Sequence, residues 1–116
     1  MNTLYGIKNC DSVKKAKKWL HENDTEYTFH DYKTQGVPEE KLTKWLSLFD
    51  WDIVLNKRGT TYRQLDDDTK ASLNQDTAHS VLMQHASMIK RPILSTHSGE
   101  THIGFKPDTY QEIFQR

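Results

Sequence analysis

The sequence has a single cysteine, no excess of either charge and no long apolar segment. One cysteine, Cys10, cannot form an internal disulfide, so any disulfide at Cys10 must join it to another molecule. The 16 basic and 16 acidic side chains cancel, which removes the overall positive field that drives non-specific nucleic-acid binding. The longest apolar runs have three residues, whereas a membrane helix needs about 20. No basic region followed by an apolar segment opens the chain, so we expect a cytoplasmic protein without membrane or nucleic-acid partners.

Aromatic residues are present in numbers that suit a packed core: three Trp, five Tyr and four Phe among 116 residues. The length predicts one domain covering residues 1–116. No repeat, low-complexity segment or interdomain linker is visible in the sequence.

The order of the expected elements is βαβ, then a helical block, then ββα. A short strand near Leu4–Ile7 precedes a helix with apolar residues at positions 13, 16 and 20, and Tyr27–His30 alternates as a second strand. Helices are expected within an insertion at about residues 37–88, one of them starting with Pro38 in its first turn. Residues 56–61 look like a polar loop, and Asp66–Asp68 suit a helix cap.

The C-terminal part predicts a hairpin followed by a helix. Arg91–Leu94 opens one strand, Thr101–Phe105 can return antiparallel, and Pro107 starts the last helix. Together the two halves predict an α/β fold with one mixed four-stranded sheet covered by helices.

Cys10 lies where the first strand gives way to the first helix. A helix N-terminus has unpaired N–H groups and a partial positive charge, both of which favour a thiolate. Lys8 and Lys14 add positive charge nearby, while Asp11 and Asp31 offset it. The competing interpretation is a small buried cysteine with no chemistry. Because polar residues flank Cys10 on both sides, the pattern favours a reactive thiolate.

Arg91-Pro92 is the second notable feature, because it precedes the strand expected beside the first one. From the residues alone a trans bond before Pro92 is the ordinary expectation. A cis bond would leave neighbouring backbone groups to pair with a substrate.

Several short motifs in combination resemble the arsenate reductase family, in the branch that contains the YffB and Spx proteins. They are residues 4–10 (LYGIKNC), 15–16, 19–20, 56–62 (NKRGTTY), 90–93 (KRPI) and 103–105 (IGF). The likeness covers nearly the whole chain. It implies a thioredoxin-like fold with a helical insertion.

The resemblance also implies roles for individual residues. Cys10 takes the position of the nucleophile, Pro92 that of a cis-proline, and Arg91 that of an oxyanion-binding arginine, with Arg58 near a second such arginine. The candidate binding residues around the cysteine are Lys8, Asn9, Lys14, Arg58, Arg91 and Pro92.

Two departures from the family pattern argue against arsenate as the substrate. Phe105, next to Lys106, stands where arsenate reductases of this family have a further arginine, and Lys14 replaces an arginine after the nucleophile. Lysine offers one mobile charge where arginine binds an oxyanion through two parallel bonds.

The leading functional expectation is a thiol-dependent reductase that uses glutathione. Without a second cysteine, an external thiol must release any adduct at Cys10, and glutathione or another small thiol, with glutaredoxin as a further partner, fits that role. No tightly bound cofactor is expected.

Two other functions remain open. One is an Spx-like binding module that contacts RNA polymerase; Val13 excludes the Cys-x-x-Cys switch that many Spx proteins use. The other is a true arsenate reductase working with glutathione and glutaredoxin. A metal site is not expected, because the six histidines include no pair spaced i, i+4.

Overall fold

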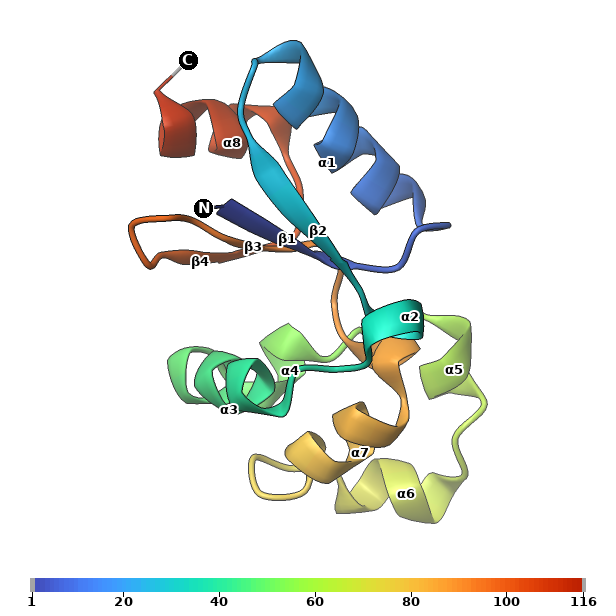
Figure 1. The fold of residues 1–116 in the computed structure, drawn as a ribbon. Helices are drawn as coiled ribbons and strands as arrows, with labels where there is room; N and C mark the ends of the chain where they lie inside the picture. Colours follow the sequence, from blue (N-terminus) through green and yellow to red (C-terminus); the bar gives the residue numbers. More distant parts are fainter. Residues whose placement is uncertain (1, 116) are drawn as a thin grey trace. The chain divides into compact units, whose positions relative to one another are not determined.

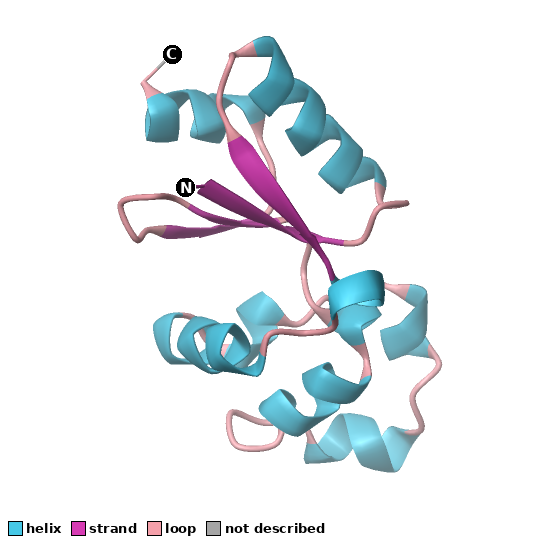
Figure 2. Cartoon of the chain, viewed as in Figure 1, coloured by secondary structure: helices cyan, strands magenta, loops and turns pink. Residues whose placement is uncertain are grey.

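The computed structural model describes residues 2–115 and divides the chain into two compact units. One unit combines the chain up to Gln35 with the chain from Arg91 onward, and the other is Gly36–Lys90. The first unit contains the sheet and the second is helical (Figure 2).

The first unit contains β1 to β4 with helices α1, α2 and α8. Their bounds are β1 Asn2–Gly6, α1 Asp11–Glu22, β2 Tyr27–Asp31, α2 Tyr32–Gln35, β3 Ile93–Ser95, β4 Thr101–Ile103 and α8 Pro107–Phe114. The strand order is β2-β1-β3-β4, with β1 parallel to β2 and the other pairs antiparallel (Figure 1). The predicted α/β fold with a mixed four-stranded sheet is thus confirmed.

Helices α1 and α8 pack against the same face of this sheet (Figure 1). The apolar stripe predicted for α1 is the buried one. Its residues share a core with side chains of β1, β3 and α8, and the cluster consists of Leu4, Val13, Ala16, Leu20, Leu94 and Tyr110. Burying this stripe fixes which side of α1 faces the sheet, and leaves its lysines on the outer sides.

The second unit is built from short helices. They are α3 Glu39–Leu48, α4 Trp51–Val54, α5 Thr60–Arg63, α6 Asp67–Ser72, α7 Ala78–Gln84 and a 3₁₀ turn η1 at Ala86–Met88. Leu55, directly after α4, and Ile89, near the end of this unit, form an isolated antiparallel bridge. The predicted cap of α6 is present, because the Asp66 side chain accepts a hydrogen bond from the Thr69 amide.

Three local expectations differ from the structure. Pro38 is the residue before α3, in extended backbone, and so does not begin the first turn. Thr60 and Thr61, expected in a loop, begin α5. Helix α2 was not expected at all, since its four residues are too few to show an apolar repeat.

Among residues 2–115, no helix is both long enough and apolar enough to cross a membrane.

Candidate functional site

The segment from Gly6 to Cys10 carries the chain from the end of β1 into α1. Gly6 and Ile7 are buried, whereas Lys8 and Asn9 are exposed at the turn. The Cys10 amide donates to the Ile7 carbonyl at 3.2 Å, and the Cys10 carbonyl accepts from the Lys14 amide at 3.0 Å. Cys10 is therefore the N-cap residue of α1, in extended backbone.

Gly6 allows α1 to start close to the strand. A Cβ atom at this position would lie 2.7 Å from Cγ2 of Val13, which is shorter than any ordinary contact. The absence of a side chain at Gly6 thus lets the first turn of α1 approach the end of β1. Cys10 is thereby held close to the C-terminal end of this strand.

The Cys10 thiol is half-buried and its pKa lies below the ordinary value. Burial alone raises this pKa, but two groups together lower it by more. Arg91 donates a hydrogen bond to the sulfur and adds its positive charge, and the backbone amides of Val13 and Ser12 also lower the pKa. The sulfur makes no capping hydrogen bond of ordinary geometry, so the amides act mainly as dipoles directed at it. These groups favour the thiolate, the reactive form of cysteine.

Arg91 reaches Cys10 because of how β3 pairs with β1. Tyr5 lies opposite Ile93 in an antiparallel pair, so residues before Ile93 run beside those after Tyr5. The Arg91–Pro92 peptide bond is cis, as the family resemblance implied. Pro92 is buried, and its carbonyl accepts a hydrogen bond from the Gly104 amide at 2.8 Å.

The predicted basic residues near Cys10 differ in their placement. Lys8 and Lys14 are exposed on either side of the cysteine in sequence. Arg58 belongs to the helical unit, where it is exposed and its amide donates to the Asn56 side chain at 3.1 Å. A part for Arg58 at the cysteine stays a prediction.

Lys17 is a further basic residue of this region, outside the predicted set of binding residues. Its ammonium lies 3.6 Å from the centre of the Phe29 ring on β2. Partial burial lowers the pKa of Lys17, the Asp31 carboxylate raises it, and the Lys8 charge lowers it. Lys8 and Lys17 therefore contribute to the same positive field, which a helical wheel of α1 alone does not show.

Phe105, at the position where the resemblance implied an arginine, is partly buried and packs against the core. Its ring meets Tyr110 edge-on at 4.7 Å between centroids. A half-buried aromatic ring at this position offers no charge to an oxyanion.

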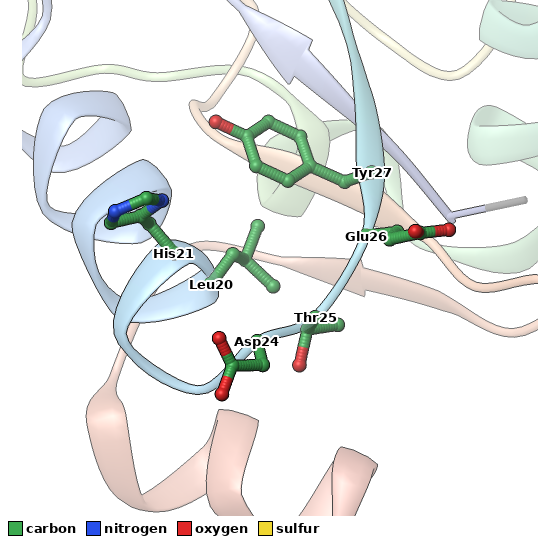
Figure 3. A pocket seen from close by; sticks show the side chains of 6 residues that line it. All are labelled: Leu20, His21, Asp24, Thr25, Glu26 and Tyr27. Atoms are coloured by element: carbon green, nitrogen blue, oxygen red, sulfur yellow. The ribbon is translucent and has the colours of Figure 1, made fainter.

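A shallow hollow of about 670 Å³ lies at the other end of α1 (Figure 3). It is lined by Leu20, His21, Asp24, Thr25, Glu26 and Tyr27. A helix of 12 residues is about 18 Å long, so this hollow is remote from Cys10. Within residues 2–115, no group of three or more His, Cys, Asp or Glu side chains is arranged to hold a metal ion.

Comparison with known proteins identifies the family. The sequence matches the profile of the ArsC family over residues 5–113. The chain belongs to the ArsC family. An uncharacterised protein of Haemophilus influenzae is 47% identical over 114 residues, which cover 98% of this chain and 99% of that protein.

ArsC relatives also include a solved structure and a regulator. The structure, of a protein named YffB, superposes with a TM-score of 0.91 at 46% identity and covers 97% of both chains. A global transcriptional regulator Spx of Staphylococcus saprophyticus is 26% identical over all of this chain and 88% of its own. The fold is accordingly that of the thioredoxin-like ArsC proteins, close to the YffB type.

Proposed function

We propose that this ArsC-family protein is a glutathione-dependent thiol reductase with Cys10 as its only nucleophile. The observation that carries the proposal is the pairing of a half-buried thiol, at the start of α1, with the Arg91 guanidinium. That pairing favours the thiolate over the thiol, and the half-buried cysteine remains partly exposed.

The reaction then needs two exchanges at one sulfur. The Cys10 thiolate attacks a substrate disulfide, forms a mixed disulfide and expels the other half of the substrate as a thiolate, which takes a proton from water. A glutathione thiolate next attacks the substrate sulfur of the mixed disulfide, which restores the Cys10 thiolate and releases the second half of the substrate as a disulfide with glutathione. The external thiol is required because Cys10 is the sole cysteine of the chain.

Positive charge around Cys10 suits glutathione, which carries two carboxylates. Arg91, Lys8 and Lys14 supply that charge, and the exposed Asn9 and the backbone before Pro92 supply neutral hydrogen-bonding groups. Arg58 stays a predicted glutathione-binding residue. Glutaredoxin is proposed as a further thiol donor.

The direct test is formation of the adduct. The reduced protein is incubated with glutathione disulfide, and intact mass is measured before and after addition of reduced glutathione. We expect one glutathione per chain on Cys10, and its removal by the thiol; Cys10→Ser should take up none. A Cys10 thiol that is alkylated with an ordinary cysteine pKa, about 8.5, and gives no adduct would contradict the proposal.

A regulatory binding module is the second candidate, favoured by the similarity to Spx along the whole chain. Retention of the protein on purified RNA polymerase, independent of Cys10→Ser, would support this function. A reductase without a regulatory role should pass through unbound.

Arsenate reduction is expected to be weak. Phe105 packs on Tyr110 instead of presenting a cation, and Lys14 cannot bind an oxyanion through two parallel bonds. Steady turnover of arsenate with glutathione and glutaredoxin would show that Arg91 alone is sufficient for that substrate.

A further inference from the structure

Tyr32 lies at the same end of the parallel strands as Cys10, and the proposed function assigns it no role. Strands β1 and β2 are parallel, with Gly6 opposite Asp31, so the residues that follow the two strands emerge side by side. Tyr32 is the first residue after β2, and only 3% of it is exposed. Its ring meets His30 at 5.9 Å between centroids, which holds the phenol in place.

The hydroxyl group of Tyr32 is buried and has no hydrogen-bond partner. Buried polar groups without a hydrogen-bond partner are rare in folded proteins, and they often mark a functional or strained position. Burial raises the pKa of Tyr32, the neighbouring Tyr5 raises it further, and the charge of Arg91 lowers it. The guanidinium is thus close enough to act on this hydroxyl as well as on Cys10.

A buried hydroxyl without a partner is not unique to Tyr32, because Tyr110 has one as well. The Tyr110 ring packs against three other aromatic rings, those of Trp19, Phe105 and Phe114. Of these two tyrosines, Tyr32 is the one whose unsatisfied oxygen lies near a cation that also interacts with the Cys10 sulfur.

We propose that Tyr32 is a positioning residue whose hydroxyl oxygen accepts a hydrogen bond from Arg91 once Cys10 has entered a disulfide. In the reduced protein the thiolate attracts the guanidinium. When Cys10 forms a mixed disulfide the sulfur loses its negative charge, and its attraction for the Arg91 guanidinium falls. The Tyr32 oxygen, already buried within range of the same charge, then accepts one of the five guanidinium N–H groups.

This arrangement would stabilise the mixed disulfide relative to the free thiolate. Arg91 would interact with the thiolate in the reduced protein and with Tyr32 in the mixed disulfide. It rests on the proposed function only in requiring that Cys10 form disulfides. Glutathione itself is not required, so a neutral disulfide can test the inference separately.

The experiment measures the equilibrium at Cys10 in mixtures of 2-hydroxyethyl disulfide and 2-mercaptoethanol, which carry no charge. Intact mass gives the fraction of mixed disulfide. Cys10–S⁻ and R–S–S–R yield Cys10–S–S–R and R–S⁻. We expect Tyr32→Phe to lower the equilibrium constant about tenfold, as loss of a hydrogen bond to a charged group implies. The matched variant Tyr110→Phe should stay within about twofold of the wild type.

The double variant decides whether Tyr32 acts through Arg91. In an Arg91→Ala background, Tyr32→Phe should have no further effect, since the two residues form one interaction. Equal equilibrium constants for Tyr32→Phe and wild type, or a full effect of Tyr32→Phe without Arg91, would overturn the inference.

A spectroscopic measurement covers the case in which the equilibrium lies too far to one side. Methyl methanethiosulfonate converts Cys10 to a methyl disulfide chemically, and nitrogen-15 NMR reports the Arg91 side chain before and after. The Arg91 Nε–H resonance should move in wild type and Tyr110→Phe, and move differently in Tyr32→Phe. An identical change in all three proteins would overturn the inference, whereas a failed glutathione assay would count only against the proposed function.

Discussion

At the scale of single residues, the reactivity of Cys10 depends on one charged neighbour. The thiol is partly buried, and burial opposes ionisation. The first-turn amides of α1 are part of the backbone and are present whatever the side chains are. Arg91 is the contribution that a substitution can remove, and it supplies both a hydrogen bond and a charge.

Replacing Arg91 with alanine should therefore raise the pKa of Cys10. The thiolate fraction at pH 7 falls, and the rate of disulfide exchange should decrease about tenfold, the size expected for loss of a charge-assisted hydrogen bond. The rate of alkylation by iodoacetamide between pH 5 and 10 measures the pKa directly. Arg63→Ala, which removes an exposed arginine of the helical unit, is the control.

Arg91→Lys separates charge from geometry. Lysine retains the positive charge but not the planar array of donors. We expect an intermediate pKa for Cys10, between those of the wild type and Arg91→Ala. A pKa in Arg91→Ala equal to that of the wild type would show that the helix amides alone stabilise the thiolate.

At the scale of elements, the position of Cys10 depends on how closely α1 approaches β1. Gly6→Ala would place a Cβ atom 2.7 Å from Val13 Cγ2. Both residues are buried, so the first turn of α1 must shift. We expect a loss of about 1–3 kcal/mol in the free energy of unfolding, as for other overpacked sites, and slower alkylation of Cys10.

Val13→Ala provides the control for this prediction. It destabilises the protein on its own by removing buried methyl groups. In the double variant the clash is absent, so the two losses should sum to more than the measured loss. If urea denaturation gives strictly additive losses in the free energy of unfolding, a clash with Val13 is not the reason that Gly6→Ala is destabilised.

The elements that the sequence predicted well are those with a clear apolar repeat. The stripe of Val13, Ala16 and Leu20 gave the face of α1 that meets the sheet, and the hairpin followed from its turn residues. Helix α2 has no such repeat in four residues. The cis bond at Arg91-Pro92 had no local signal, and only the family resemblance implied it.

The residues alone predicted only the part of the site around Cys10, and Arg91 and Pro92 came from the family resemblance. Cys10 at a helix start can be read from the order of the elements. Tyr32 follows a strand that is parallel to β1, so the edge it shares with Cys10 could have been inferred. Its unsatisfied hydroxyl could not, because burial and partners depend on packing across the whole unit.

At the scale of the whole molecule, the buried tyrosines set how stability responds to alkaline pH. Burial raises the pKa values of Tyr32 and Tyr110 well above the ordinary value of about 10. In the folded protein both therefore stay protonated where the unfolded chain has already lost these protons. The stabilising effect of the neutral phenols is complete below pH 10 and decreases as the pH rises above it.

The free energy of unfolding should accordingly fall above pH 10, by up to about 1.4 kcal/mol per pH unit for each such tyrosine. Urea denaturation followed by circular dichroism at pH 8 to 11 measures this slope. Tyr110→Phe leaves the aromatic packing with Trp19 in place and removes one ionisable group, so its slope should be shallower by about one proton. Tyr27→Phe, at a half-buried position on β2, should change the slope less. If Tyr110→Phe and the wild type lose stability in parallel, the alkaline sensitivity arises elsewhere, because no other change separates the two proteins.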